Sequence, residues 1–138
     1  MKNIIKFSLS LLMVVSLMNC NDRNDENLVQ SVERVKIDSV KIAQDSMAVF
    51  TIQTIKTYSN FSNNCEGFYG YDYIHTDQLS RSVSAFKFKT ASQCGEEFAR
   101  ASQINFQPQF PGIYTFKFWN GKDAAGQNIW IEKTIKVK

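Results

Sequence analysis

The stretch GIYTFKFWNGKDAAGQNIWIEKTIKV, residues 112–137, alternates apolar and polar side chains on both sides of a polar centre. The apolar side chains that share a face are Tyr114, Phe116 and Phe118 before the centre, and Ile129, Ile131, Ile135 and Val137 after it. A period of two is typical of strands, and we expect both apolar faces to be buried. The polar centre, with Gly121 and Gly126, suits a long hairpin turn.

The same alternation runs through the chain upstream of this hairpin. It predicts seven strands, at residues 32–43, 48–58, 68–74, 82–90, 103–107, 113–120 and 129–137. Helical periodicity is nearly absent, with room for one short turn at 92–100. Short strands separated by regular turn signals predict an all-β fold, an immunoglobulin-like antiparallel β-sandwich over residues 31–138. A barrel is the main alternative.

A further pointer to the sandwich is the turn at Pro111 and Gly112, which feeds a strand with an early tyrosine, Tyr114. In a tyrosine corner, the hydroxyl of such a residue returns to the backbone just upstream. We expect that bond here, the alternative being a buried tyrosine with some other partner.

The N-terminus has the features of an export signal. Lys2 and Lys6 are followed by an apolar run at 7–18, too short for a permanent membrane-spanning helix, and then by polar sequence. Leu17 and Cys20 resemble a lipobox, although Asn19 stands where Gly, Ala or Ser is usual. We expect residues 1–19 to be a signal peptide and Cys20 to carry the lipid that anchors the protein in the membrane. The alternative is an ordinary cleaved signal that leaves Cys20 as a thiol.

Cysteine count and charge narrow the class of protein further. With Cys20 lipidated, Cys65 and Cys94 remain as a pair, and in an exported protein we expect one disulfide worth about 3 to 4 kcal/mol on the chain-entropy model. The mature chain is long enough for one domain.

Removal of Lys2 and Lys6 lowers the formal charge of the protein from +3 to +1. No basic stripe remains, so we expect no nucleic-acid partner.

Residues 20–30 are polar and lack periodicity, and so we expect a flexible tether behind the anchor. Asp22, Asp25 and Glu26 follow Cys20 closely and resemble the acidic export signal of Bacteroidetes surface lipoproteins. The alternative is that a linker carries these charges for solubility.

The tail at 111–137 resembles the end of small Bacteroidetes lipoproteins, of flavobacterial type, with an immunoglobulin-like domain. The resemblance is carried by Pro111, Gly112, Tyr114, Phe116, Phe118, Trp119, Gly121, Asp123, Gly126 and Lys133, with weaker support from the signal and from the segment 65–68. It implies the fold and an envelope location, in the outer membrane and on the cell surface. It brings no catalytic residues, since the function of the family is generally unassigned, and fold alone does not give activity.

Catalytic and metal-binding patterns are weak. His75 is the single histidine, and in a strand it shares a face with Asp77 while Asp72 points the other way, so we expect no metal or acid–base site there. Asp123 in the loop 120–128 has oxygen ligands that suit calcium, but a turn needs the same residues. Glu96 and Glu97 are adjacent and do not face each other across a cleft. We therefore expect neither enzyme activity nor a cofactor.

Tyr69, Tyr71 and Tyr73 alternate along one segment and, in a regular strand, share a face. Exposed, they would form a platform for a glycan or a protein; turned inward, they would be core. The sequence therefore suggests a membrane-anchored, non-catalytic module that binds a glycan or a protein. The alternative is a periplasm-facing inhibitor or assembly component that inserts the loop 120–128 into a cleft.

Overall fold

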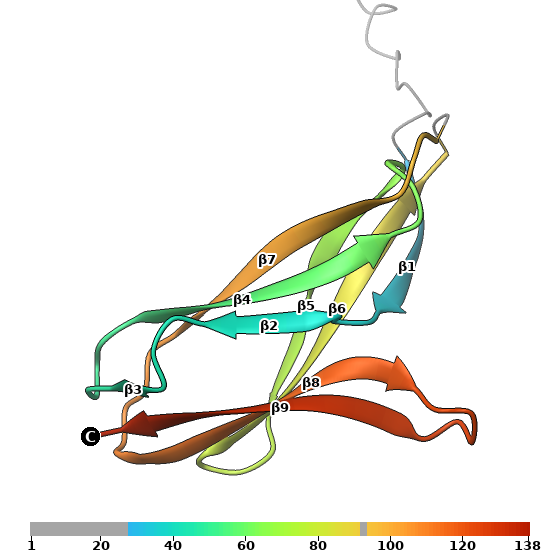
Figure 1. Ribbon diagram of the computed structural model, residues 1–138. Coiled ribbons are helices and arrows are strands. Elements are labelled where there is room, and N and C mark those ends of the chain that lie inside the picture. The colour runs from blue at the N-terminus through green and yellow to red at the C-terminus, as the bar shows by residue number, and fades with distance from the viewer. Residues whose placement is uncertain (1–27, 92–93) are drawn as a thin grey trace, which may run out of the picture.

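The computed structural model describes residues 28–91 and 94–138, and these form strands and loops without a helix (Figure 1). The strands are β1 (Val29–Val35), β2 (Ser39–Ile42), β3 (Ser46–Met47), β4 (Gln53–Phe61), β5 (Glu66–His75), β6 (Ser80–Thr90), β7 (Phe98–Phe106), β8 (Gly112–Lys122) and β9 (Asn128–Val137). They build two mainly antiparallel sheets that face each other. The predicted β-sandwich is confirmed, and the helical turn expected within 92–100 is wrong for its described part, because β7 already begins at Phe98.

The larger sheet is organised around β6. One edge of β6 pairs with β5, and the other edge is shared by β1 and β8, after which β9 and the short β3 follow. The second sheet has the order β2-β4-β7. The strands β5 and β7 are consequently edge strands within the described part of the chain.

The first predicted strand, 32–43, is two strands in different sheets. The backbone N–H of Ile37 donates to the carbonyl of Trp119 in one sheet, at 2.9 Å, and the N–H of Asp38 donates to Tyr58 in the other, at 2.8 Å. Consecutive residues thus bond to opposite layers. The chain crosses the sandwich here, a change of sheet that an uninterrupted period of two does not reveal.

The core lies between the sheets and is rich in aromatic rings. Tyr114, Phe116 and Phe118 are buried as predicted, and Phe106 packs edge-on against the first two, with ring centroids 5.0 Å apart in each pair. The expectation for β9 is only partly correct, because Ile129 is 41% exposed. It lies beside the β8–β9 hairpin turn, which projects beyond the neighbouring strands (Figure 1).

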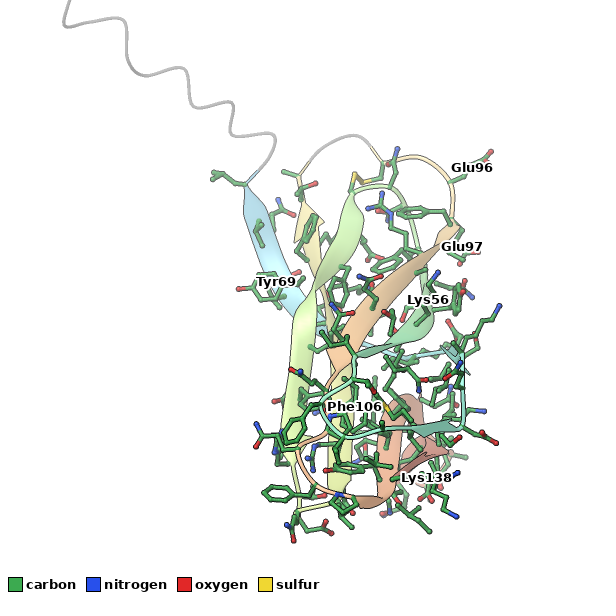
Figure 2. The ribbon with its side chains drawn as sticks, turned by 90° about the vertical axis from the view of Figure 1, so that its left-hand side faces the viewer. Lys56, Tyr69, Glu96, Glu97, Phe106 and Lys138 are labelled. Carbon is green, nitrogen blue, oxygen red and sulfur yellow. A yellow bond between two sulfur atoms is a disulfide. The ribbon has the colours of Figure 1, made fainter. Side chains whose placement is uncertain are left out.

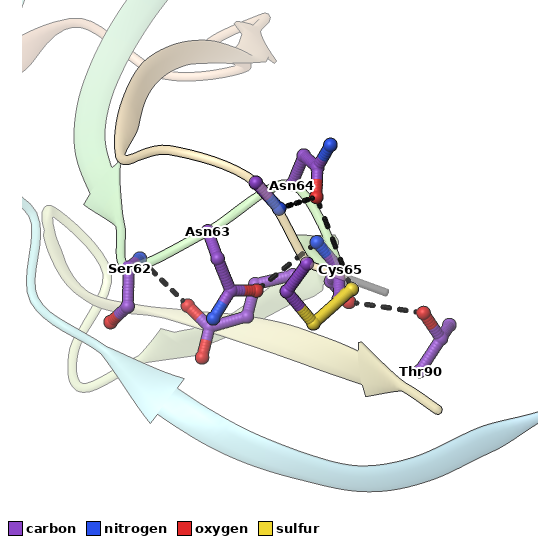
Figure 3. Close-up of a disulfide and its surroundings, with 8 residues drawn as sticks. Ser62, Asn63, Asn64, Cys65 and Thr90 are labelled. Atoms are coloured by element: carbon purple, nitrogen blue, oxygen red, sulfur yellow. Dashed lines mark hydrogen bonds between the residues drawn. A yellow bond between two sulfur atoms is a disulfide. The ribbon is translucent and has the colours of Figure 1, made fainter. Parts of the chain in front are cut away.

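The predicted disulfide is present and joins the start of β5 to the segment before β7 (Figure 3). Around it, the carbonyl of Cys65 accepts from the backbone N–H of Thr90, and the side-chain oxygen of Asn64 accepts from the N–H of Gly95 at 2.7 Å. The disulfide therefore links the edges of both sheets at the end where β1 begins (Figure 2).

The N-terminal predictions fall mostly outside the described residues. These are the signal peptide 1–19, lipidation of Cys20, and the acidic residues Asp22, Asp25 and Glu26. The last two residues of the predicted tether, 29–30, belong to β1. No described segment forms a helix that is long and apolar enough to cross a membrane.

Candidate functional site

The predicted tyrosine stripe is divided between two faces of β5. The pairing of β5 with β6 shifts register between Phe68 and Gly70, so Tyr69 is an extra residue in a β-bulge. Its ring is 62% exposed and points away from the sandwich (Figure 2), whereas Tyr71 and Tyr73 are half-buried against the core. The hydroxyls of Tyr71 and Thr57 are 2.6 Å apart across the two sheets. A shared platform of three rings is therefore wrong, because the bulge breaks the alternation.

The weak catalytic and metal candidates stay apart. His75 is exposed at the end of β5 and packs edge-on against Tyr73, while Asp77 lies in the following loop and accepts the N–H of Leu79 at 2.7 Å. Glu96 and Glu97 are both exposed (Figure 2). Within residues 28–91 and 94–138, no three His, Cys, Asp or Glu side chains gather to hold a metal ion.

The carboxylate of Asp123 is engaged in the hairpin turn. Its Oδ1 accepts the backbone N–H groups of Ala125 and Gln127, at 2.9 and 2.8 Å. The side-chain oxygen of Asn128 accepts the indole N–H of Trp119. These bonds favour the turn interpretation of this loop over a calcium site, because Oδ1 of Asp123 and the side-chain oxygen of Asn128 already have donors.

A more distinctive site lies at the end of the sandwich opposite Leu28. Three loops meet there, at residues 48–52, 76–79 and 107–111, and we call them the loop tip. Figure 1 shows this end, where the C-terminus lies, far from the start of β1, and Figure 2 shows Lys138 there. The loop tip therefore lies at the end of the domain that is far from Leu28.

Phe50 in the first of these loops has an unusual backbone. Its φ is 62°, in the left-handed region that non-glycine residues rarely adopt, and its side chain is 66% exposed. Its N–H donates to the carbonyl of Pro108 at 2.8 Å, and its carbonyl accepts from Nε2 of Gln107 at 3.0 Å. Hydrogen bonds from the neighbouring loop thus fix the backbone of Phe50 in a costly conformation. This conformation leaves its apolar ring exposed.

A second exposed ring, Phe110, extends from the loop 107–111 and is 51% exposed. The backbone beneath it is fixed by the predicted tyrosine corner, since the buried Tyr114 hydroxyl donates to the carbonyl of Phe110 at 3.1 Å. The corner is confirmed. Its position shows that it holds a loop that carries an exposed aromatic side chain.

Two adjoining hollows open beside these rings, with volumes of about 300 and 260 Å³. Both are lined by His75, Arg81 and Gln107; Tyr73 and Asn105 belong to the first hollow, and Gln78 and Phe110 to the second. The lining combines polar and apolar surface in similar measure and contains no carboxylate.

Arg81 is the charged residue at the floor of both hollows. It is only 7% exposed, its Nη1 donates to the carbonyls of Asp77, Gln78 and Ser80, and its guanidinium lies over the ring of Tyr114, 5.3 Å from the centroid. Its Nε is buried and has no hydrogen-bond partner. Arg81 therefore holds the 76–79 loop and brings a positive charge to the hollows.

The pKa of Tyr73 is shifted because its hydroxyl is partly buried beside Arg81. Burial raises the pKa of the Tyr73 hydroxyl, and the nearby positive charge of Arg81, with its hydrogen bond, offsets part of that rise. Tyr73 is thus a neutral hydroxyl at the wall of the first hollow over the physiological pH range. The chemistry available at the site is hydrogen bonding and attraction of an anion.

A larger hollow of about 450 Å³ lies on the outer face of the β2-β4-β7 sheet. Its lining includes Lys41 and Lys56, which are directly opposite each other in the pairing of β2 and β4. Like charges at opposed positions are unfavourable, but both side chains extend into solvent, where the repulsion is screened. We prefer the loop tip because its charge is buried and its loops are cross-bonded.

Sequence patterns do not single out Phe50, Arg81 or Gln107. A lone phenylalanine between short strands, or a lone arginine at the start of one, has no motif, and their importance arises from contacts between distant loops. The signals that lie at this end are the turn at Pro111 and Gly112, the single histidine His75, and Tyr73 of the tyrosine stripe.

Comparison with known proteins identifies no relative: no protein-family model, curated protein or solved structure matches this chain. The resemblance to Bacteroidetes lipoproteins therefore remains a prediction, and a functional proposal has to rest on the geometry of the loop tip.

Proposed function

We propose that this protein is a membrane-anchored, non-catalytic envelope lipoprotein that binds a glycan or a protein through its loop tip. The observation that carries the proposal is the backbone of Phe50, which holds an exposed ring in a left-handed conformation. Such a conformation costs about 1 to 3 kcal/mol and persists only where surrounding structure imposes it. The turn from Ala48 to Thr51 and the bonds to Pro108 and Gln107 impose it here, and they leave the ring exposed for contact with a ligand.

The position of the loop tip agrees with an N-terminal anchor. Lipid on Cys20, followed by a polar segment, would hold the domain at the end where β1 and the disulfide lie, so that the tip faces away from the membrane (Figure 1). The disulfide stiffens the attached end, and the tyrosine corner stiffens the presenting end. This arrangement suits a module on the outer surface of the cell.

The alternative is a periplasm-facing inhibitor or assembly component. The β8–β9 turn supports it, because Asp123 accepts two backbone N–H groups and makes a rigid projecting loop. Preorganised loops of this kind suit insertion into the cleft of a partner, since little ordering entropy is lost on binding.

One experiment tests the anchor and separates the two locations. Intact cells that produce the full chain are treated with protease, and the N-terminus of the mature protein is analysed by mass spectrometry. A lipid on Cys20 and loss of the domain to protease are the expected results. Protection from protease with lipid present would favour the periplasmic alternative. A Cys20→Ala variant is the control, and lipid-independent retention of that variant in the membrane would overturn the anchor.

A further inference from the structure

Arg81 is a buried cation, and the carboxylate whose charge interacts with it is that of Asp77 in the loop 76–79. In the described part of the chain, no Asp or Glu forms an ion pair with its guanidinium, and its Nε lacks any acceptor. Burial of a charge is costly unless an opposite charge or good hydrogen bonds compensate it. The three loop carbonyls accept from Nη1, and the side chain also hydrogen-bonds the Tyr73 hydroxyl. The positive charge still has no carboxylate beside it in the lining of either hollow, and this favours an anion there.

The surroundings of Arg81 define what kind of anion fits. Hollows of about 300 and 260 Å³ match a small group, such as a sugar unit, better than the flat footprint of a folded protein. Gln107, Asn105 and Tyr73 provide amide and hydroxyl groups that pair with sugar hydroxyls. The carboxylate of Asp77 lies outside the lining of both hollows and accepts the N–H of Leu79, although its charge interacts with that of Arg81.

The exposed rings complete the site. Phe110 lines the second hollow, and Phe50 is bonded to the same loop through Pro108 and Gln107. Aromatic rings beside a partly polar hollow suit a pyranose ring, because its apolar C–H face packs against them. The acidic side chain of a peptide has no such face.

We infer that the Arg81 hollow binds the carboxylate of an acidic sugar, with Phe110 packing against the sugar ring. The inference rests on the proposed function and narrows its ligand to glycans that contain uronic acid. Arg81 supplies the positive charge that attracts the carboxylate, and its bonds to the loop carbonyls hold that charge in place beside the hollows.

The test is titration calorimetry of the full lipoprotein in detergent with short oligogalacturonates and oligoglucuronates. Their methyl esters are the matched ligands, because they keep the sugar and remove the charge. We expect at least one acid form to bind and its ester to bind at least about tenfold more weakly. Equal binding of acid and ester would overturn the inference.

Variants locate the binding. Arg81→Lys keeps the charge and should weaken binding about tenfold or more, since lysine cannot reproduce the guanidinium bonds that hold the 76–79 loop at the hollow. Because a change at a buried arginine can disturb folding, Phe110→Ala provides a second variant at an exposed side chain, with the same expected direction. Lys56→Gln removes a positive charge from the outer sheet face and should leave binding unchanged. A loss with Lys56→Gln as large as with Arg81→Lys would contradict a specific site.

The outcomes also separate this inference from the proposed function. If none of the uronate probes binds while protease treatment and mass spectrometry support a surface lipoprotein, the acidic-sugar ligand is wrong and the anchored module stands. Binding of an acidic peptide but of no uronate would likewise overturn the inference in favour of a protein ligand.

Discussion

The backbone N–H of Phe50 donates to the carbonyl of Pro108 at 2.8 Å, and this bond joins loops that are far apart in the sequence. Gln107 adds a second bond to the same residue, from its side chain to the Phe50 carbonyl. The loop that follows β3 and the loop that follows β7 therefore behave as one surface. That surface presents Phe50 and Phe110 beside the buried charge of Arg81.

Phe50→Gly should raise the free energy of unfolding by up to about 1 kcal/mol, although it removes an apolar side chain. Glycine adopts a positive φ freely, whereas other residues lose roughly 1 to 2 kcal/mol there. Urea unfolding measures the change. Phe50→Ala is the control, because it removes the ring and keeps the strain, and a Phe50→Ala protein more stable than Phe50→Gly would contradict the left-handed backbone.

Tyr114→Phe should lower the free energy of unfolding by about 1 to 2 kcal/mol. The change removes the bond from the hydroxyl to the Phe110 carbonyl and keeps the buried ring. Thermal and urea unfolding test the loss. The same substitution at the exposed Tyr69 should have almost no effect, and equal effects at the two positions would argue against the corner.

Loss of the disulfide should lower the free energy of unfolding by about 3 to 4 kcal/mol, because the bond closes a segment with a sequence separation of 29. The comparison is between the oxidised protein and a variant with both Cys65→Ala and Cys94→Ala. Both proteins should show the same far-ultraviolet spectrum if the sandwich still forms. Identical unfolding curves would show that the bond contributes nothing.

Glu66 makes stability depend on pH. Burial by itself would raise its pKa, but hydrogen bonds from Lys87 and from the N–H of Ser62, with the charges of Lys87 and Lys89, outweigh burial and hold the pKa below its ordinary value of 4.5. A carboxyl whose pKa is depressed in the folded state stabilises the protein above its unfolded pKa, and this contribution is lost as the pH falls through the folded value.

Glu66→Gln should therefore be less stable than the wild type at neutral pH, and the difference should shrink below pH 4.5. Unfolding curves recorded across this range test the prediction. Glu132→Gln is the control, since Glu132 pairs with Lys117 at 3.2 Å on an exposed face, where ion pairs contribute little. Parallel pH profiles for the wild type and Glu66→Gln would contradict the role of the buried pair.

Local alternation was enough to predict the strands that carry most of the core. Tyr114, Phe116 and Phe118 face inward as expected, and the tyrosine corner follows from a turn placed just before a strand. Alternation gave the wrong side-chain direction or the wrong sheet where a single residue interrupts the regular pairing of a strand. The bulge at Tyr69 turns that ring outward, and the crossing at Ile37 moves the chain into the other sheet.

The candidate site was less accessible to sequence reasoning, for a physical reason. The left-handed backbone of Phe50 depends on Pro108 and Gln107, which are distant in the sequence. The burial of Arg81 likewise depends on the ring of Tyr114 from another strand. Neither relationship leaves a local pattern of residue types.

Site-specific photocrosslinking tests the central claim most directly. Gln109, exposed in the loop tip, is replaced by a residue with a diazirine side chain in the full-length protein, and irradiation of the cells that produce it records which ligand is adjacent. Matched probes replace Tyr69 and Lys117 on the outer sheet face. The account predicts a glycan or protein adduct at position 109 and none at the other two. An adduct confined to position 69 or 117 would contradict it and place the binding surface on the sheet.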